Sequence, residues 1–135
     1  MAKKLKTKSG FVNILGIPNS GKSTLINTLV GSKISIVSHK VQTTRFCVRG
    51  ICNYTFEDQS QSQVILIDTP GIFLAKRRLD KAMVSAAWSE LSHSDKVIFI
   101  HDVTKSLDEN AIEIIKKIEK VKVNIILVLN KIDLL

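Results

Sequence analysis

The sequence predicts a three-layer α/β/α fold, in which helices cover both faces of a mainly parallel sheet that contains one antiparallel strand. Short apolar segments alternate with amphipathic helical segments along the chain, as in parallel-sheet proteins. Two successive strand-like segments are separated only by a polar turn, which adds the antiparallel member. The 135 residues, 44% of them hydrophobic, are sufficient for one domain.

The first half of the chain is expected to hold three strands and one helix. Residues 11–15 form a short apolar strand. Residues 22–30 form a helix that ends at Gly31, because glycine is favoured just after helix C-termini. Residues 45–54 and 63–67 have strand composition, and the polar EDQSQS segment between them predicts a hairpin.

The second half is expected to continue the alternation of helices and strands. Apolar side chains recur every four positions in residues 79–91, which predicts a helix with one buried face. Trp88 in this helix is expected to pack against the core rather than to bind a ligand. Residues 97–100 and 124–129 are expected to be apolar strands.

A further helix is predicted between these two strands, over residues 107–121. Ser106 and Glu109 have the spacing of a capping box at its start. Four apolar residues of this helix are expected to face inward: Ala111, Ile114, Ile115 and Ile118.

We expect one domain over residues 1–135, and an incomplete one, because no helix follows the last strand. Without such a helix, the strand over residues 125–129 would present apolar side chains at an open sheet edge.

The net charge of +8 and the pI near 9.7 favour contact with a polyanion such as RNA, or with an anionic membrane surface. In the alternative interpretation, the lysines within residues 3–8 form a solvated tail and those within 116–122 complement the dipole of their helix. No apolar stretch is long enough to cross a bilayer and no secretory signal is readable, so we expect a cytoplasmic protein, with peripheral contact at the inner membrane face as a further option. Cys47 and Cys52 are expected to be reduced, and the histidines lack metal-ligand spacing.

Residues 16–23 read GIPNSGKS, the GxxxxGKS pattern of a phosphate-binding loop, or P-loop. Gly16 and Gly21 should let the loop turn backbone NH groups toward phosphate oxygens, through conformations that a Cβ would obstruct. Lys22 is expected to reach the β and γ phosphates and Ser23 to bind Mg²⁺. An ordinary strand-to-helix turn is the alternative, but the preceding apolar strand favours a P-loop NTPase. The expected nucleotide contacts here are Gly16, Ile17, Pro18, Asn19, Ser20, Gly21, Lys22, Ser23 and Thr24.

A second pattern, DTPG, directly follows the strand over residues 63–67. Asp68 is expected to hold Mg²⁺ through water, without being paired to a protein cation. Gly71 lacks a Cβ, so its NH can approach the γ phosphate, and loss of that phosphate would release the loop that follows. On its own, DTPG would indicate only a β-turn. The expected nucleotide contacts are Asp68, Thr69, Pro70 and Gly71.

The third pattern, NKID at residues 130–133, indicates which base is bound. Asp133 can accept hydrogen bonds from the ring imino group and the exocyclic amino group of guanine, whereas adenine offers neither donor there. Asn130 is expected near the base and the P-loop, and the stem of Lys131 should cover the base. Three function classes are compatible with parts of this evidence: a GTPase switch, a P-loop ATPase or nucleotide kinase, and a noncatalytic RNA-binding module.

Over essentially all 135 residues, the chain resembles the GTPase domain of the Era family, bacterial small-ribosomal-subunit assembly factors in the TrmE-Era-EngA-like group of P-loop GTPases. The motifs above are shared with sister GTPases that modify tRNA or act on the large subunit, and these remain the alternative. The KVQTTR segment at residues 40–45 favours Era, since the sisters carry GTTRD-like sequences there. The resemblance implies slow hydrolysis of GTP to GDP and phosphate by a switch in small-subunit assembly and 16S rRNA maturation.

The resemblance also implies roles for single residues. Thr44, favoured over its neighbour Thr43, would bind Mg²⁺ and the γ phosphate, so the implied metal ligands are Ser23, Thr44 and Asp68. Ile72 stands where Ras-like enzymes carry a water-orienting glutamine, and its side chain cannot polarise water. Asn19 would instead help to hold a K⁺ ion beside the phosphates, or would merely cap the loop. The implied catalytic residues are Asn19, Lys22, Thr44 and Gly71.

Two departures from the Era pattern accompany the resemblance. No fifth guanine-contacting motif follows Asp133, and no GxxG loop of a KH-type RNA-binding domain appears outside the P-loop region. Binding to 16S rRNA and the small subunit is therefore expected through a KH domain that this chain does not contain. The chain is expected to be a monomer.

Overall fold

The computed structural model describes residues 6–31, 47–68, 85, 88, 89 and 91–135, and the strands within these ranges form one five-stranded sheet. The strands are β1 (Thr7–Gly16), β2 (Cys47–Thr55), β3 (Gln61–Asp68), β4 (Lys96–Asp102) and β5 (Asn124–Asn130). Their order is β2-β3-β1-β4-β5, with β2 antiparallel to β3 and the other pairs parallel. The predicted sheet, mainly parallel with one antiparallel strand, is confirmed.

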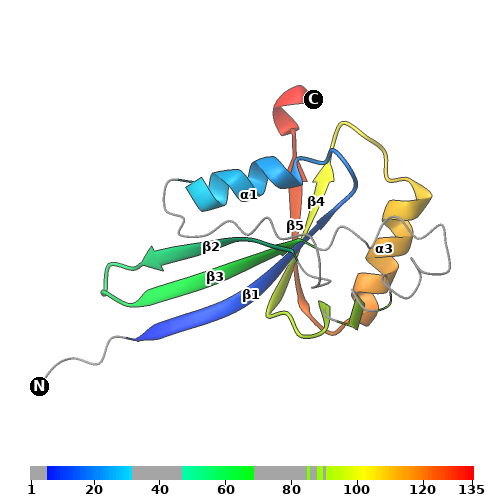
Figure 1. Ribbon diagram of the computed structural model, residues 1–135. Helices are drawn as coiled ribbons and strands as arrows, with labels where there is room; N and C mark the ends of the chain where they lie inside the picture. The colour runs from blue at the N-terminus through cyan, green and yellow to red at the C-terminus, as the bar shows by residue number, and fades with distance from the viewer. Residues whose placement is uncertain (1–5, 32–46, 69–84, 86–87, 90) are drawn as a thin grey trace, which may run out of the picture.

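Helices α1 (Lys22–Val30) and α3 (Glu109–Lys120) lie apart from each other beside the sheet in Figure 1. Consecutive residues of a strand point to opposite faces of the sheet. Ile14 belongs to the buried cluster on the α1 side, whereas its neighbour Leu15 belongs to the cluster on the α3 side. The two helices therefore cover opposite faces, which gives the expected three layers.

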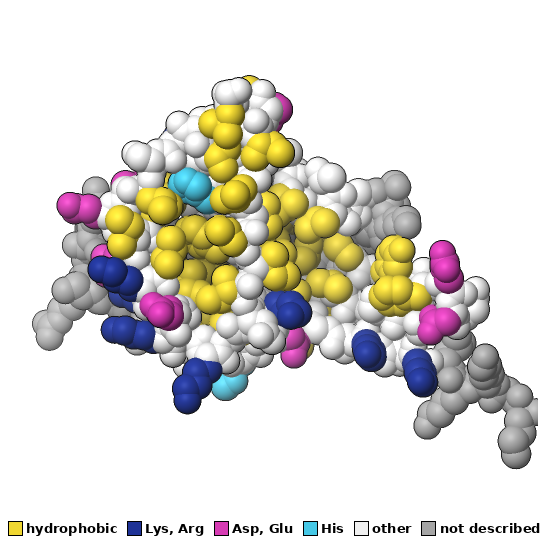
Figure 2. Space-filling model, turned by 180° about the vertical axis from the view of Figure 1, so that it is seen from behind, with side chains coloured by type: hydrophobic (Ala, Val, Ile, Leu, Met, Phe, Trp, Pro, Cys, Tyr) yellow, Lys and Arg dark blue, Asp and Glu magenta, His cyan; other side chains and the backbone are white. Residues whose placement is uncertain are grey.

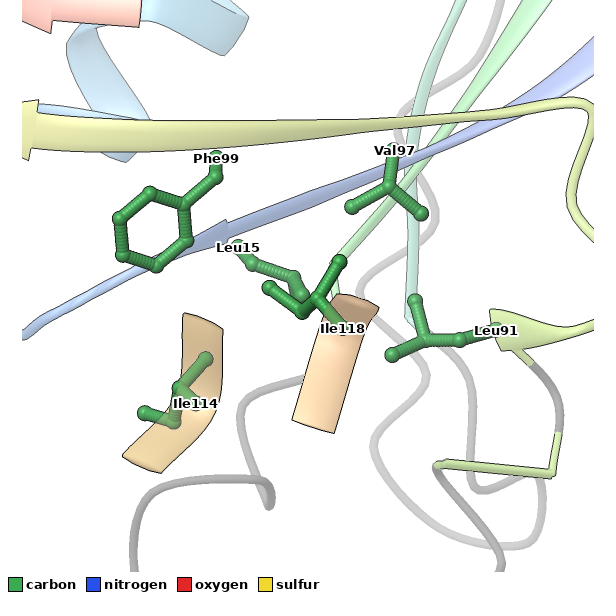
Figure 3. Packing of buried hydrophobic residues seen from close by; sticks show 6 residues of the cluster. All are labelled: Leu15, Leu91, Val97, Phe99, Ile114 and Ile118. Atoms are coloured by element: carbon green, nitrogen blue, oxygen red, sulfur yellow. The ribbon is translucent and has the colours of Figure 1, made fainter. Parts of the chain in front are cut away.

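Among the described residues, the buried cluster on the α3 side is larger than that on the α1 side. Figure 3 shows Leu15 of β1 and Val97 and Phe99 of β4 directed toward Ile114 and Ile118 of α3. All of these side chains are buried, as is Leu91. Trp88 packs against the same cluster, as the sequence predicted, whereas most of the helix expected over residues 79–91 lies outside the described residues.

Two predictions about α3 are wrong. Its N-cap is Asp108, not Ser106, and the Asp108 carboxylate accepts a hydrogen bond of 2.7 Å from the Ala111 backbone NH. Aspartate is a strong N-cap, so it starts the helix later and replaces the expected capping box. Ile115 is 39% exposed because it lies at the margin of the face that Ala111 buries together with Ile114 and Ile118.

Strand β1 begins four residues earlier than its apolar pattern predicted. Its polar start pairs in parallel with β3, beginning with Thr7 opposite Gln61. The β2–β3 hairpin turns through residues 56–60, where the Phe56 NH donates to the Ser60 carbonyl at 2.8 Å. Apolar periodicity detects only the buried part of a strand, so the exposed hairpin end extends beyond it.

Strand β5 forms one edge of the sheet, and its apolar side chains are exposed. Ile125 is 46% exposed and Leu127 is 60% exposed, which confirms the predicted open edge. Figure 2 shows apolar side chains gathered in one broad patch on this side of the molecule. Among the described residues, no helix is both long and apolar enough to span a bilayer.

Candidate nucleotide-binding site

The candidate site lies at the carboxyl edge of the sheet, where four strands end. The parallel register aligns these ends, with Ile14 opposite Asp68 and Asp102 opposite Asn130. The P-loop follows β1, DTPG begins at the end of β3, and NKID begins at the end of β5. Patterns separated by up to about a hundred residues therefore meet at the edge where open α/β sheets bind ligands.

The two glycines of the P-loop serve different physical purposes. Gly21 has φ of 95° at the N-cap of α1, a conformation that favours glycine, and a Cβ there would also collide with the Asn130 side-chain amide. Gly16 has no positive φ, but a Cβ would meet the Ile100 side chain and would lie 2.5 Å from the Ser20 hydroxyl. The expected conformational role therefore holds for Gly21, whereas a glycine is needed at position 16 because there is no room for a Cβ.

The NKID segment is hydrogen-bonded directly to the P-loop. The Asn130 amide Nδ2 donates to the Ser20 carbonyl at 2.9 Å, and the Lys131 ammonium donates to the Asn19 carbonyl at 3.0 Å. The expected proximity of Asn130 to the P-loop is confirmed. Asp133 follows on an exposed 3-10 turn (Ile132–Leu134).

Asp102, at the end of β4, is a site residue that the sequence analysis missed. Its carboxylate lies 2.7 Å from the Lys131 ammonium and also accepts hydrogen bonds from the Thr104 backbone NH and hydroxyl. Lys131 first, and then Thr104, hold the pKa of Asp102 well below its ordinary value. The signal was available, because Asp102 follows an apolar strand in the same way as Asp68 does.

Asp68 is 3% exposed, and its Oδ1 lies 3.6 Å from the Lys22 ammonium. The expectation that no protein cation pairs with Asp68 is therefore wrong. A buried carboxylate is costly without a compensating charge, and Lys22 at the start of α1 is near enough to supply one.

A pocket of about 400 Å³ opens between the P-loop and the NKID segment. It is lined by Ile17, Asn19, Gly21, Lys22, Ser23, Thr24 and Lys131. The Ser23 hydroxyl and the Asp68 carboxylate are oxygen ligands of the kind that Mg²⁺ prefers, so the donor set fits that ion. Among the described residues, no group of three or more His, Cys, Asp or Glu side chains is arranged to hold a metal. The predicted site residues Thr44, Thr69, Pro70 and Gly71, and also Ile72, lie outside the described residues.

The family model described as 50S ribosome-binding GTPase matches residues 11–131 of this chain. The chain belongs to this GTPase family. The matched range contains the first two nucleotide patterns and, of the third, Asn130 and Lys131.

Curated relatives of this GTPase carry the name GTPase Era. The protein from Bradyrhizobium sp. (strain ORS 278) is 55% identical over 128 residues, which is 95% of this chain and 40% of the relative. The protein from Brucella suis is 49% identical over the same shares of the two chains. The chain thus spans about 40% of the length of the curated relatives that it matches.

Solved structures of Era share the fold of this GTPase. A point variant of Aquifex aeolicus Era bound to GDP·AlF4⁻ matches with a TM-score of 0.69 at 41% identity, over 93% of this chain and 42% of that one. Era in complex with MgGDPNP and nucleotides 1506–1542 of 16S ribosomal RNA matches with a TM-score of 0.67 at 38% identity, over 94% and 42%. The G domain of the T. maritima FeoB iron transporter matches at 0.64 and 25% identity, over 93% and 74%.

Proposed function

We propose that residues 1–135 form the GTP-binding domain of an Era-type switch that binds GDP and GTP and slowly hydrolyses GTP. The observation that carries the proposal is the pair of hydrogen bonds from Asn130 and Lys131 to the P-loop carbonyls of Ser20 and Asn19. They place the segment that would read guanine beside the loop that would hold its phosphates.

Base recognition is assigned to the NKID segment. Asp133 accepts hydrogen bonds from the imino and amino groups of guanine, and adenine would leave this carboxylate unpaired. Asn130 contributes beside the base, and the stem of Lys131 lines the pocket that the base enters.

Phosphate binding is assigned to the P-loop and the start of α1. Several backbone NH groups of the P-loop and the N-terminal end of α1 would face the phosphate oxygens. Lys22, whose ammonium lies 3.6 Å from the Asp68 carboxylate, is assigned to the β and γ phosphates. Ser23, Asp68 and Thr44 would hold Mg²⁺, which neutralises charge on the phosphate oxygens when it is bound.

Hydrolysis is assigned to Asn19, Lys22, Thr44 and Gly71. Because Ile72 cannot orient water, a K⁺ ion held with the help of Asn19 would offset charge that develops between the phosphates. Asn19 has φ of 65°, so the backbone is turned at this position of the loop. Exchanging Na⁺ for K⁺ should accelerate GTP turnover, and an Asn19→Ala variant should lose that acceleration while still binding GDP. Equal rates of the parent in both salts would contradict the K⁺ role.

The biological partner is proposed from the relatives. Since they are named GTPase Era and an Era structure contains 16S rRNA, we propose that this domain serves small-subunit assembly in the cytoplasm, with rRNA bound through a KH domain outside residues 1–135. The net charge of +8 is compatible with a polyanionic partner and also with peripheral contact to an anionic membrane. We expect the domain to act as a monomer.

Competition for a fluorescent guanine nucleotide tests the proposed nucleotide class. Unlabelled GTP should displace the probe at concentrations at least about 10⁴-fold lower than ATP, because a site built around donors on the base rejects analogues that lack them. Equal displacement by ATP would indicate a P-loop ATPase or kinase. RNA binding that is insensitive to nucleotide and weakens steeply with salt would favour the noncatalytic alternative.

A further inference from the structure

Lys131 adopts an unfavourable backbone conformation between the end of β5 and the 3-10 turn that follows. Its φ of 63° and ψ of 32° lie in the left-handed region, which residues with a Cβ rarely adopt. This bend turns the chain from the end of β5 into the 3-10 turn that carries Asp133. Whatever holds Lys131 in this conformation therefore also sets the path of the turn that carries Asp133.

The side chain of Lys131 is fixed at its charged end by two contacts. The ammonium lies 2.7 Å from the Asp102 carboxylate and donates to the Asn19 carbonyl at 3.0 Å. The NH of Val103, the residue after Asp102, also donates to the Asn130 carbonyl at 3.1 Å. The end of β4 thus holds the start of the NKID segment through both its backbone and its side chain.

Asp102 is itself firmly held. Its side chain is 5% exposed, and its Oδ1 accepts from the Thr104 NH at 3.0 Å and the Thr104 hydroxyl at 2.6 Å. This leaves Oδ2 directed at Lys131. A buried carboxylate with one oxygen fixed by its own strand end is a rigid acceptor, and a rigid acceptor can set the orientation of a flexible lysine.

We propose that Asp102 is a positioning residue for base selection, which holds Lys131 against the P-loop and thereby aligns Asp133 with the imino and amino groups of guanine. The inference rests on the proposed function, because it assumes that Asp133 reads the base. Asp102 touches no nucleotide in this scheme and acts only through Lys131.

A base-selectivity ratio separates this role from a merely structural one. Inosine diphosphate (IDP) lacks the exocyclic amino group of guanine, so the ratio of GDP to IDP affinity reports the alignment of Asp133 with that group. A residue that only stabilises the fold would lower both affinities equally and leave the ratio unchanged. The loss of one hydrogen bond to a charged acceptor predicts a ratio of about 10 to 100 in the parent protein.

The test measures GDP, IDP and ADP affinities for the parent, Asp102→Asn, Thr104→Val and Glu113→Gln. Asp102→Asn keeps an acceptor for Thr104 and removes the charge that faces Lys131. Glu113→Gln is the matched control, because Glu113 pairs with Lys117 at 2.6 Å on the exposed face of helix α3. The GDP to IDP ratio should fall about tenfold in Asp102→Asn, about threefold in Thr104→Val and not at all in the control.

An unchanged ratio in Asp102→Asn, with GDP and IDP weakened alike, would overturn the inference and leave the proposed function intact. If Asp102→Asn does not fold, an unchanged ratio in the nearly isosteric Thr104→Val variant would overturn it in the same way. A parent protein that binds ADP as tightly as GDP would overturn the proposed function, and the inference with it.

Discussion

Two lysine–aspartate pairs lie at the carboxyl edge of the sheet, at the ends of β3 and β4 on either side of β1, and they differ in geometry. The Lys22 ammonium is 3.6 Å from the Asp68 carboxylate, beyond hydrogen-bond distance, whereas the Lys131 ammonium is 2.7 Å from that of Asp102. Both aspartate side chains are 5% exposed, so burial does not explain the difference. In the second pair, Asp102 also accepts hydrogen bonds from Thr104, and Lys131 also donates to the Asn19 carbonyl.

The contrast shows that the same residue types at equivalent strand ends can have different roles. We call Lys22 and Asp68 the exchangeable pair, because ligands would replace their contact, and Lys131 and Asp102 the fixed pair, because they would keep theirs. In the proposed function, Lys22 binds a phosphate group and Asp68 binds Mg²⁺. Nucleotide binding would therefore replace the contact between Lys22 and Asp68. In the same proposal, Asp102 and Lys131 remain partners whether or not nucleotide is bound. Substitutions at the first pair should therefore change ligand binding most, and substitutions at the second should change selectivity and stability.

The largest expected effect is that of Lys22→Ala, which removes the cation of the exchangeable pair. Affinity for GDP should fall about 100-fold, because a hydrogen bond between charged groups contributes up to about 3 kcal/mol. Isothermal titration calorimetry measures the change, and Lys120→Ala on the exposed surface of α3 is the control. A fall below about threefold would show that Lys22 does not bind the phosphates.

Gly21→Ala should disrupt the contact between the P-loop and the NKID segment. Its φ of 95° is unfavourable for alanine, and the added Cβ would displace the Asn130 amide. We expect the free energy of unfolding to fall by about 2–3 kcal/mol in chemical denaturation.

The matched control for Gly21→Ala is the same substitution in an Asn130→Ala background, which removes the amide that the new Cβ would meet. The cost of Gly21→Ala should be smaller there by at least about 1 kcal/mol, since only the backbone strain remains. Equal losses in the two backgrounds would show that the contact with Asn130 does not matter for stability.

Asp68→Asn should uncouple metal binding from nucleotide binding. Mg²⁺ should strengthen GTP binding in the parent, and this gain should shrink by about 10–100-fold when a carboxylate that holds the hydrated ion becomes an amide. Titrations of GTP with Mg²⁺ and with EDTA measure the gain. The same gain in the parent and the variant would show that Asp68 does not hold Mg²⁺.

The smallest effect concerns the pH dependence of the fixed pair. Because Lys131 lowers the pKa of Asp102, its contribution to stability should be fully present above the ordinary aspartate pKa of about 3.9 and should be lost as the pH falls toward the lower folded value. The difference in unfolding free energy between the parent and Asp102→Asn should stay constant from pH 7 to about pH 5 and shrink below about pH 4. A difference that instead changes near neutral pH would point to another titrating group.

The strand and loop framework of the site was predictable because it depends on local signals. The helix over residues 22–30 has the same bounds in the structure, and Asn130 lies beside the P-loop as its position after an apolar strand predicted. Apolar runs locate the buried part of each strand, and parallel strands bring their carboxyl ends together.

Contacts between side chains from different elements were not predictable in this way. The pairing of Lys22 with Asp68 joins α1 to β3, and the spacing of residues along the sequence does not predict such a contact. Asp102 follows an apolar strand as Asp68 does, but its bond to Lys131 appears only when β4 and β5 are paired. The start of α3 at Asp108 depended on a choice among competing capping residues, which local sequence does not decide.

The account depends most directly on guanine recognition by Asp133, and a reversal of base preference tests it. Xanthine carries a carbonyl where guanine carries its exocyclic amino group, so the amide of an Asp133→Asn variant can donate a hydrogen bond that the carboxylate cannot. We predict that the parent binds GDP more tightly than xanthosine diphosphate and that the variant prefers xanthosine diphosphate. An unchanged preference in the variant, or no GDP binding by the folded parent, would contradict the account.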